Sequence, residues 1–231
     1  MFLLLGAVWQ FVAIHQKSIL PSLDDVGAEL LSRPGFYLSN LWVTVYAALI
    51  GFLIGTALAI TLAITVIHFS FLRSAVVPVA LLLNVTPIVA ISPALIVAFG
   101  FNAVPHVIVA AVAAFFPMLI NAMSGLQSVD PQALEVFRSM AASRADIFFR
   151  LRLPTSLPYL FAGAKLAISA AMVGSIVSEF MGTSHGIGAT IVMATTYLNL
   201  NQMWAAIFIS AISSLVLIGL VDLLEKMTIR W

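Results

Sequence analysis

Long apolar runs alternate with short polar connections along this chain. The runs occupy residues 1–14, 42–67, 74–101, 105–124, 158–181 and 204–224. Most of them reach the roughly 20 residues that a helix needs to cross a bilayer. Because lipid offers no hydrogen-bond partner to open backbone, we expect every run to be helical. The pattern predicts an all-α, polytopic membrane protein with about six transmembrane helices.

Composition supports this class and excludes others. Hydrophobic residues make up 62% of the chain, charged residues 8%, and the mean hydropathy is +1.14. Soluble domains carry about a quarter charged residues. We therefore expect one membrane domain over residues 1–231. A net charge of +1 gives no basis for nucleic-acid binding, and the absence of cysteine excludes disulfides and thiolate chemistry.

The distribution of Lys and Arg predicts the orientation. With six spans and both termini in the cytoplasm, most basic residues fall on the cytoplasmic side: Arg73, Arg138, Arg144, Arg150, Arg152, Lys226 and Arg230. Only Lys17 and Arg33 fall outside, as the positive-inside rule requires. The 1–14 run is interpreted as a short first span, or as one whose start was misassigned, because no basic segment precedes it.

The run at 74–101 is too long for a straight span. Its 28 residues would extend about 42 Å as a helix, against a hydrocarbon core of about 30 Å. Pro87 and Pro93 each remove a backbone donor, so we predict a kinked or broken helix at mid-membrane depth. It carries Asn84, Thr86 and Ser92. Two interpretations stay open: the break lines a transport pathway, or the prolines serve plain packing.

A polar block at residues 130–154 interrupts the apolar pattern and holds four of the ten basic residues. Asp130 followed by Pro131 is typical of a helix start. The apolar positions of this helix recur at helical spacing: Leu134, Phe137 and Met140.

A second helix is expected in the same block. Ser143 and Asp146 form a capping-box pattern, and Pro154 and Pro158 are expected to stop the helix and lead into the next span. Two short helices with arginines on one side suit insertion into a groove of a partner. The alternative is a plain cytoplasmic loop that follows positive-inside statistics.

This block resembles a known motif. Glu135-Val136-Phe137, three residues, Ala141, nine residues and Leu151-Arg152-Leu153-Pro154 match the spacing of the EAA loop in bacterial ABC-importer permeases. That pattern is Glu-Ala-Ala, three residues, Gly, nine residues and Ile-x-Leu-Pro. Ala141 stands at the glycine position. If the glycine serves a positive φ, Ala141 would cost about 1 kcal/mol or shift the bend.

The resemblance covers nearly the whole chain and extends to the nitrate, sulfonate and taurine permease subfamily. The segments that carry it are Ile19-Leu20-Pro21-Ser22, Pro93-Ala94-Leu95, Phe99-Gly100-Phe101, Phe115-Phe116-Pro117, Gly186-Ile187-Gly188, Leu224-Glu225-Lys226 and Trp231. Within the subfamily, Leu151 to Pro154 and Leu157 to Gly163 look closer to permeases of thiamine-pyrimidine precursors or riboflavin.

The resemblance implies a type I ABC importer permease in the bacterial cytoplasmic (inner) membrane, working by alternating access and hydrolysing nothing itself. Implied partners are a cytoplasmic ABC ATPase dimer that binds ATP and Mg²⁺, a second permease chain, expected as a homodimer although a paralogue stays open, and an extracytoplasmic binding protein. The binding protein would contact segments 18–40 and 182–203. This chain would hold no cofactor.

It also implies that a coupling loop at about 125–157 meets the ATPase. The coupling residues would be Leu134, Glu135, Phe137, Arg138, Met140, Ala141, Arg144 and Pro154. Glu135 and the arginines would touch the ATPase, whereas the apolar members would anchor the helix on its own side or in the groove.

Glu179 is an acid within an apolar span, where an ionised group costs about 3 kcal/mol. It joins Asn84, Thr86, Pro87 and Ser92 as a candidate pathway residue. Since it lies near the outer end of its span, a solvated, capping or anchoring role is the alternative.

Lys165 is expected to snorkel to the surface. His68 and His106 are interpreted as interfacial residues and not as metal ligands.

The motif Gly182-Thr183-Ser184-His185-Gly186 matches the G-x-S-x-G pattern of hydrolases. That chemistry needs a preceding strand and a later acid and histidine, so we interpret the motif as an external loop.

Two other classes of membrane protein remain as alternatives. An ion-coupled secondary transporter would show an inverted repeat and several intramembrane ionisable groups, and a membrane enzyme would need facing catalytic side chains.

Overall fold

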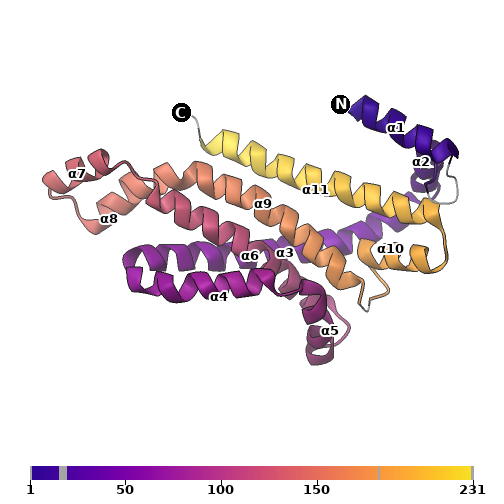
Figure 1. Ribbon diagram of the computed structural model, residues 1–231, viewed down its shortest axis with the longest axis horizontal. Coiled ribbons are helices and arrows are strands. Elements are labelled where there is room, and N and C mark those ends of the chain that lie inside the picture. The colour runs from indigo at the N-terminus through magenta and orange to yellow at the C-terminus, as the bar shows by residue number, and fades with distance from the viewer. Residues whose placement is uncertain (1, 16–19, 182, 230–231) are drawn as a thin grey trace.

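A computed structural model describes residues 2–15, 20–181 and 183–229, and the described chain is an elongated helical bundle (Figure 1). Among these described residues, four continuous helical stretches are long and apolar enough to cross a membrane: α3 (Pro34–His68), α6 (Ala103–Gln127), the stretch Arg144–Glu179, and α11 (Leu200–Thr228). A fifth crossing is formed if α4 (Arg73–Val85) and α5 (Ile88–Phe99) count as one bent span. The predicted all-α, polytopic fold is confirmed.

The shorter elements gather at the two ends of the bundle. One end carries α7 (Pro131–Ser139) and α8 (Arg144–Ile147), and the other carries α2 (Leu23–Ser32) and α10 (Ile187–Thr196) (Figure 1). A 3₁₀ turn at Ser70–Leu72 joins α3 to α4. The first predicted span is α1 (Phe2–His15), whose 14 residues extend only about 21 Å.

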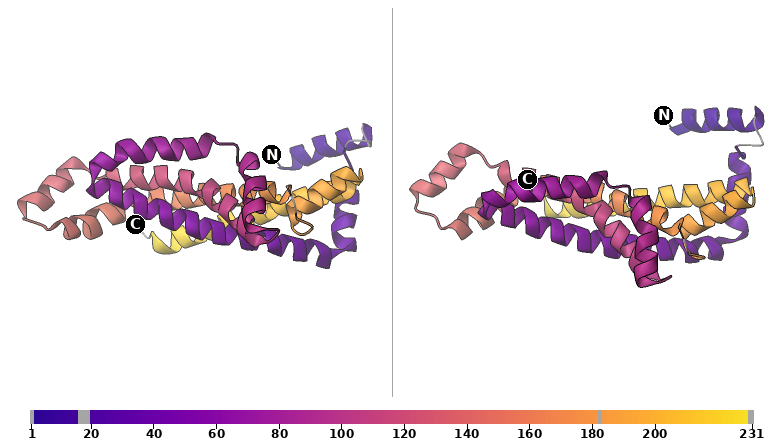
Figure 2. Two further views of the ribbon diagram at one scale, coloured as in Figure 1. Left: turned by 90° about the horizontal axis from the view of Figure 1, so that it is seen from below. Right: turned by 60° about the horizontal axis from the view of Figure 1, so that its bottom comes forward.

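Helix α1 lies outside the bundle of long helices (Figure 2). Trp9 connects it to the start of α11, because its ring meets that of Trp204 edge-on at a centroid distance of 4.6 Å. The indole N–H of Trp9 also donates to the carbonyl of Pro21 at 3.1 Å. These contacts attach α1 to the same end of the molecule that carries α2 and α10.

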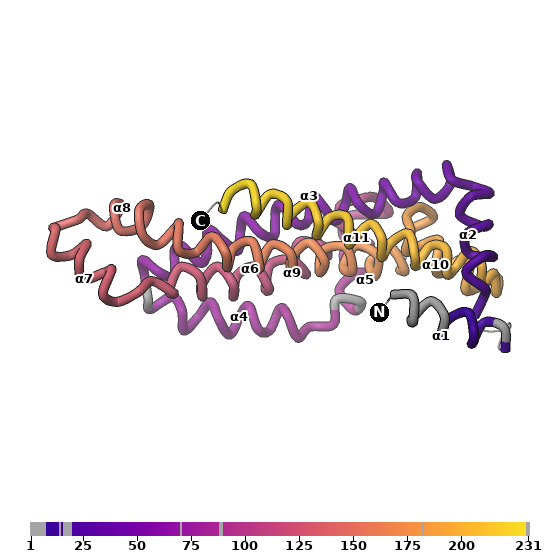
Figure 3. Tube along the Cα trace, turned by 90° about the horizontal axis from the view of Figure 1, so that it is seen from above, coloured from indigo at the N-terminus to yellow at the C-terminus, as the bar shows by residue number. Residues whose placement is uncertain are grey.

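The core lies where α3, α6 and α9 (Leu153–Glu179) pack together, with α6 and α9 side by side along the bundle (Figure 3). Small side chains dominate it: Ala48, Ala59, Ala63, Ala110, Ala114, Ala122, Ala167 and Ala171 are fully buried. Gly51 of α3 lies against the backbone of α6, so that a Cβ there would stand 2.8 Å from the Ala111 nitrogen. Small residues permit this close approach of backbones in a membrane.

The break predicted in the 74–101 run is confirmed. Helix α4 ends at Val85, α5 begins at Ile88, and the two are bent by 94°. Thr86 is extended and caps α4, since both its backbone N–H and its hydroxyl donate to the carbonyl of Leu82, at 3.0 and 2.6 Å. Pro93 lies inside α5 and does not end it. The break therefore falls at the Thr86-Pro87 pair.

The prediction that Pro154 and Pro158 stop the second loop helix is wrong, because both prolines lie within α9. Helix runs without interruption from α8 through a π-helical turn at Phe148–Arg152 into α9. In that turn the Leu153 N–H donates to the carbonyl of Phe148, five residues back. Proline lacks an N–H and crowds the preceding turn. The wider π-turn accommodates this loss, so the helix continues through Pro154.

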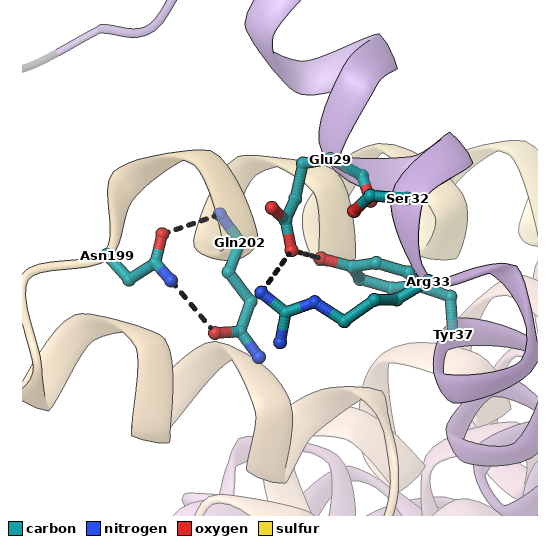
Figure 4. Close-up of polar contacts among 6 residues, drawn as sticks. All are labelled: Glu29, Ser32, Arg33, Tyr37, Asn199 and Gln202. Atoms are coloured by element: carbon teal, nitrogen blue, oxygen red, sulfur yellow. Dashed lines mark hydrogen bonds and ion pairs between the residues drawn. The ribbon is translucent and has the colours of Figure 1, made fainter.

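Two further boundaries differ from the prediction. Helix α3 begins at Pro34, ahead of the apolar run that starts at residue 42, and α10 occupies part of the segment expected to be an external loop. At the start of α3, the Tyr37 hydroxyl donates to Glu29 at 3.0 Å and Arg33 pairs with the same carboxylate at 3.5 Å (Figure 4). These contacts of Glu29 hold α2 against the first turn of α3, which precedes the apolar part of α3.

Candidate functional site

The predicted loop helix exists and begins as expected. Asp130 is the N-cap of α7, and its carboxylate accepts from the Gln132 N–H at 2.9 Å. Pro131 occupies the first turn, where its missing N–H costs nothing. The second predicted cap is also confirmed, because Ser143 and Asp146 form a reciprocal capping box at the start of α8.

Ala141 adopts the positive φ for which the glycine of the resembling motif is suited. Its φ is 52°, just beyond the end of α7. The Ala141 N–H donates to Arg138 O at 3.0 Å, and the Ala142 N–H donates to Phe137 O at 3.0 Å. This pair of bonds is a Schellman motif, the usual helix ending with a left-handed residue. The bend is kept, at the conformational cost of a side chain in the left-handed region.

Seven of the eight predicted coupling residues lie in α7, α8 and the turn between them. These elements form a projection at one end of the bundle, next to the ends of α3 and α6 (Figure 1). Glu135, Arg138 and Arg144 are exposed. Met140 is 75% exposed at the tip, so it is not an anchor on its own side, whereas Leu134 and Phe137 are half-buried. Pro154 lies apart from them, within the first turn of α9.

The predicted pathway residues are not brought together. Asn84 lines an open pocket of about 380 Å³ between α4, α6 and α9, with apolar neighbours such as Leu83, Val112 and Val173. Thr86 and Pro87 form the break beside it. Ser92 points elsewhere, since it is fully buried and its hydroxyl lies 3.0 Å from that of Ser178 in α9.

His106 is not the interfacial residue that we expected. It is buried in α6, and its Nδ1 lies 2.8 Å from the Ser178 hydroxyl. Ser92, Ser178 and His106 thus form a polar cluster that joins α5, α9 and α6. His68 is exposed at the end of α3, with Nδ1 at 2.9 Å from Ile64 O. Within the described residues, no group of three metal-ligating side chains is present.

Glu179 is the centre of a second buried network, and its 1% exposure contradicts a solvated role. One carboxylate oxygen accepts from the Gly188 N–H at 2.7 Å and the Thr44 hydroxyl at 3.0 Å. The Thr44 hydroxyl in turn accepts from the Ile187 N–H at 2.9 Å. The network fastens the start of α10 to α3 and α9.

Two glycines leave room for this carboxylate. Gly186 has φ 107°, and a Cβ at this position would stand 2.5 Å from the Glu179 carboxyl carbon. A Cβ at Gly188 would stand 2.8 Å from the Cβ of Glu179. The Gly186-Ile187-Gly188 segment is one of those that resemble the permease subfamily, and its two glycines leave the space that the Glu179 side chain occupies. Sequence reasoning found the segment and the acid separately but not their contact.

Lys165 does more than snorkel. Its ammonium group pairs with Asp222 at 2.6 Å and Glu225 at 2.5 Å, both on α11. Lys226 pairs with Asp222 at 2.7 Å. Spacing along the chain gave no sign of this cluster, because α9 and α11 meet only after folding.

The G-x-S-x-G motif lies between α9 and α10, although its Gly182 is outside the described residues. The segment before it is the end of a helix, and Ser184 is exposed. A hydrolase elbow places its serine after a strand. The structure therefore puts this serine in a helix–helix connection.

This architecture is similar to that of solved transporter permeases. A structure of the MetNI methionine ABC transporter in an inward-facing conformation matches with a TM-score of 0.74 at 16% identity, covering 86% of this chain and 99% of that chain. At that identity the likeness concerns the fold alone. The class that the fold defines is a polytopic, all-α membrane protein with the architecture of these permeases.

The family follows from the sequence match. Residues 36–230 match the family described as "Binding-protein-dependent transport system inner membrane component", and the chain belongs to it. A putative aliphatic sulfonates transport permease protein of Bacillus subtilis is 29% identical over 97% of this chain and 83% of its own length. A riboflavin transport system permease protein of Chloroflexus aurantiacus is 31% identical over 71% of this chain and 61% of its own length.

A third relative is a formylaminopyrimidine transport permease protein of Halalkalibacterium halodurans, 27% identical over 100% of this chain and 93% of its own length. These relatives confirm the predicted resemblance to ABC-importer permeases. The chain is a membrane transport subunit.

Replacing Glu179 by Ala should destabilise the chain by about 2–4 kcal/mol, because the Gly188 N–H and the Thr44 hydroxyl lose their buried acceptor. Glu179→Gln keeps one acceptor oxygen and should lose less. Denaturant unfolding in detergent micelles measures the difference. Glu135→Ala removes an exposed acid and serves as the control. Equal unfolding midpoints for Glu179→Ala and Glu135→Ala would contradict the anchoring role.

Replacing Ala141 by Gly should stabilise the end of α7 by about 1 kcal/mol, since glycine adopts positive φ without a Cβ penalty. The hydrogen-bonded amides of residues 141 and 142 should exchange about fivefold more slowly in hydrogen-exchange mass spectrometry. Ala142→Gly is the matched control, because residue 142 does not have a positive φ. A gain in the control equal to that in Ala141→Gly would exclude this explanation.

Proposed function

We propose that this chain is the permease of an ATP-driven importer and that the α7–α8 loop docks into a cytoplasmic ABC ATPase. The observation that carries the proposal is the projection of α7 beyond the spanning helices. It presents the Glu135 carboxylate together with Val136, which is 55% exposed, and Met140, which is 75% exposed. A short amphipathic helix with exposed apolar and charged groups suits a groove in a partner.

In this proposal the ATPase binds ATP and Mg²⁺, and two permease chains, in a homodimer, form an alternating-access pathway. Both termini lie in the cytoplasm and the chain spans the bacterial inner membrane. The opposite end, with α2 and α10, receives an extracytoplasmic binding protein. Family membership supports the ATPase and the binding protein as partners.

The contacts of the intramembrane ionisable groups support ATP coupling over ion coupling. Lys165 is already paired with two acids, and Glu179 accepts two short hydrogen bonds in a closed network. A secondary transporter needs such groups to exchange ions during its cycle.

The solute that we propose is a small neutral heteroaromatic compound, such as a pyrimidine precursor of thiamine or a flavin. The pocket beside the α4–α5 break is lined by apolar side chains, glycine and one amide, Asn84. An amide can hydrogen-bond a ring nitrogen or carbonyl. A sulfonate or nitrate would meet no positive charge among the lining residues. Two of the named relatives, the formylaminopyrimidine and riboflavin permeases, support this choice over the sulfonate permease.

Reversing the charge of Glu135 should uncouple the transporter. In Glu135→Lys, ATP-driven uptake into proteoliposomes should fall about tenfold or more, because a charge on the docking face is reversed. Membrane insertion and unfolding of the chain should stay unchanged. Glu135→Gln removes the charge without reversing it and should lose less uptake. Wild-type uptake together with wild-type recovery of the ATPase in Glu135→Lys would remove the coupling assignment.

The solute is tested in proteoliposomes that hold this chain, its ATPase and its binding protein. Riboflavin or formylaminopyrimidine should be taken up with ATP, and aliphatic sulfonates and nitrate should not. Asn84→Leu should lower uptake about threefold to tenfold at saturating binding protein, as expected for one lost hydrogen bond. Gly219→Ala is the control, because that position faces open space on α11. Uptake of a sulfonate in preference to both heteroaromatic solutes would overturn the proposed solute class.

A further inference from the structure

A basic pocket of about 340 Å³ lies between the end of α3 and the α7–α8 loop. Its charged lining consists of Arg138, Arg144 and Arg152, beside His68. Ile67, Leu134 and Phe148 form part of its apolar wall. Met140, which is exposed at the tip of the loop, does not line this pocket.

The positive charge of this pocket is not neutralised from within the described chain. No acidic residue lines it, and none of the ion pairs among the described residues involves Arg138 or Arg144. Arg152 donates to Leu126 O at 2.8 Å, a neutral acceptor. Arg150, in the same loop, is paired with Asp146 at 3.4 Å. Three arginines that line one pocket match an anion with several oxygens, as a phosphate group has.

The position of the pocket along the spanning helices indicates the source of such an anion. His68 is the last residue of α3 and Leu126 lies in the last turn of α6, so the pocket opens where two spanning helices end. The phosphates of lipid headgroups lie at this level, and the inner leaflet is rich in anionic lipid. The apolar wall is suited to the glycerol and the first acyl carbons next to such a phosphate.

We propose that this pocket binds the phosphate of an anionic phospholipid headgroup and that the bound lipid ties Arg138 and Arg144 to the end of α3, which leaves Glu135, Val136 and Met140 for the ATPase. The inference rests on the proposed function only for the side of the membrane that the loop faces. Lipid binding by the chain needs neither ATP nor the ATPase. Failure of the lipid site and failure of the coupling proposal are therefore distinguishable.

The test is lipid retention by the full chain, purified in mild detergent and measured by native mass spectrometry. The wild-type chain should retain phosphatidylglycerol in preference to phosphatidylcholine. The double variant Arg138→Gln/Arg144→Gln should bind phosphatidylglycerol about thirtyfold more weakly, as expected for two surface arginines. Arg150→Gln is the matched control, because it removes the same charge from the same loop outside the pocket, and it should bind like wild type. Unfolding midpoints of the variants check that each is folded.

Three results would overturn the proposal. The first is equal phosphatidylglycerol binding by the double variant and by Arg150→Gln. The second is inorganic phosphate or glycerol phosphate binding as tightly as the lipid, which would identify a site for a soluble anion. The third is loss of the lipid when the purified ATPase is added, which would assign the pocket to the protein partner.

Discussion

The fold depends on how closely α3, α6 and α9 can approach one another. Lipid tails are as apolar as the helices, so helix association in a membrane gains little from the hydrophobic effect and relies on packing and hydrogen bonds. Alanine and glycine occupy the contact positions, and Gly51 lets the two backbones of α3 and α6 meet. The larger apolar side chains mostly point outward, for example Leu53, Leu58 and Leu215, each more than half exposed.

Two clusters of hydrogen-bonded side chains fix the positions of the shorter helices on this core. Glu179 with Thr44 fixes the start of α10, and Ser178 with His106 and Ser92 fixes α5 against the core. The residues Ser178 and Glu179 are adjacent in α9 and face different partners. One turn of α9 therefore positions both α10 and the bent helix α5, and neither position follows from apolar contact alone.

Local chemistry along the chain was predictable, and contacts between distant helices were not. The cap at Asp130, the capping box at Ser143, the break at Pro87 and a site of positive φ at residue 141 each depend on a few neighbouring residues. The ion pairs of Lys165, the burial of His106 and the π-turn before Pro154 depend on which helices become neighbours or on how a turn relaxes. Helix α10 was missed because ten residues are too few for a span and its anchoring acid lies outside it.

The uninterrupted helix from Arg144 to Glu179 has a mechanical consequence. Its 36 residues form a helix of about 54 Å, with the arginine-bearing α7–α8 loop at one end and the buried Glu179 carboxylate at the other. A tilt imposed at the loop end is carried to the far end through continuous helix, in which the π-turn at Phe148–Arg152 is the irregular point. The π-turn adds one residue to the helix and so rotates the two parts by about 100° relative to each other. This offset sets which face of α9 is turned toward α3 and α10 for a given orientation of the loop.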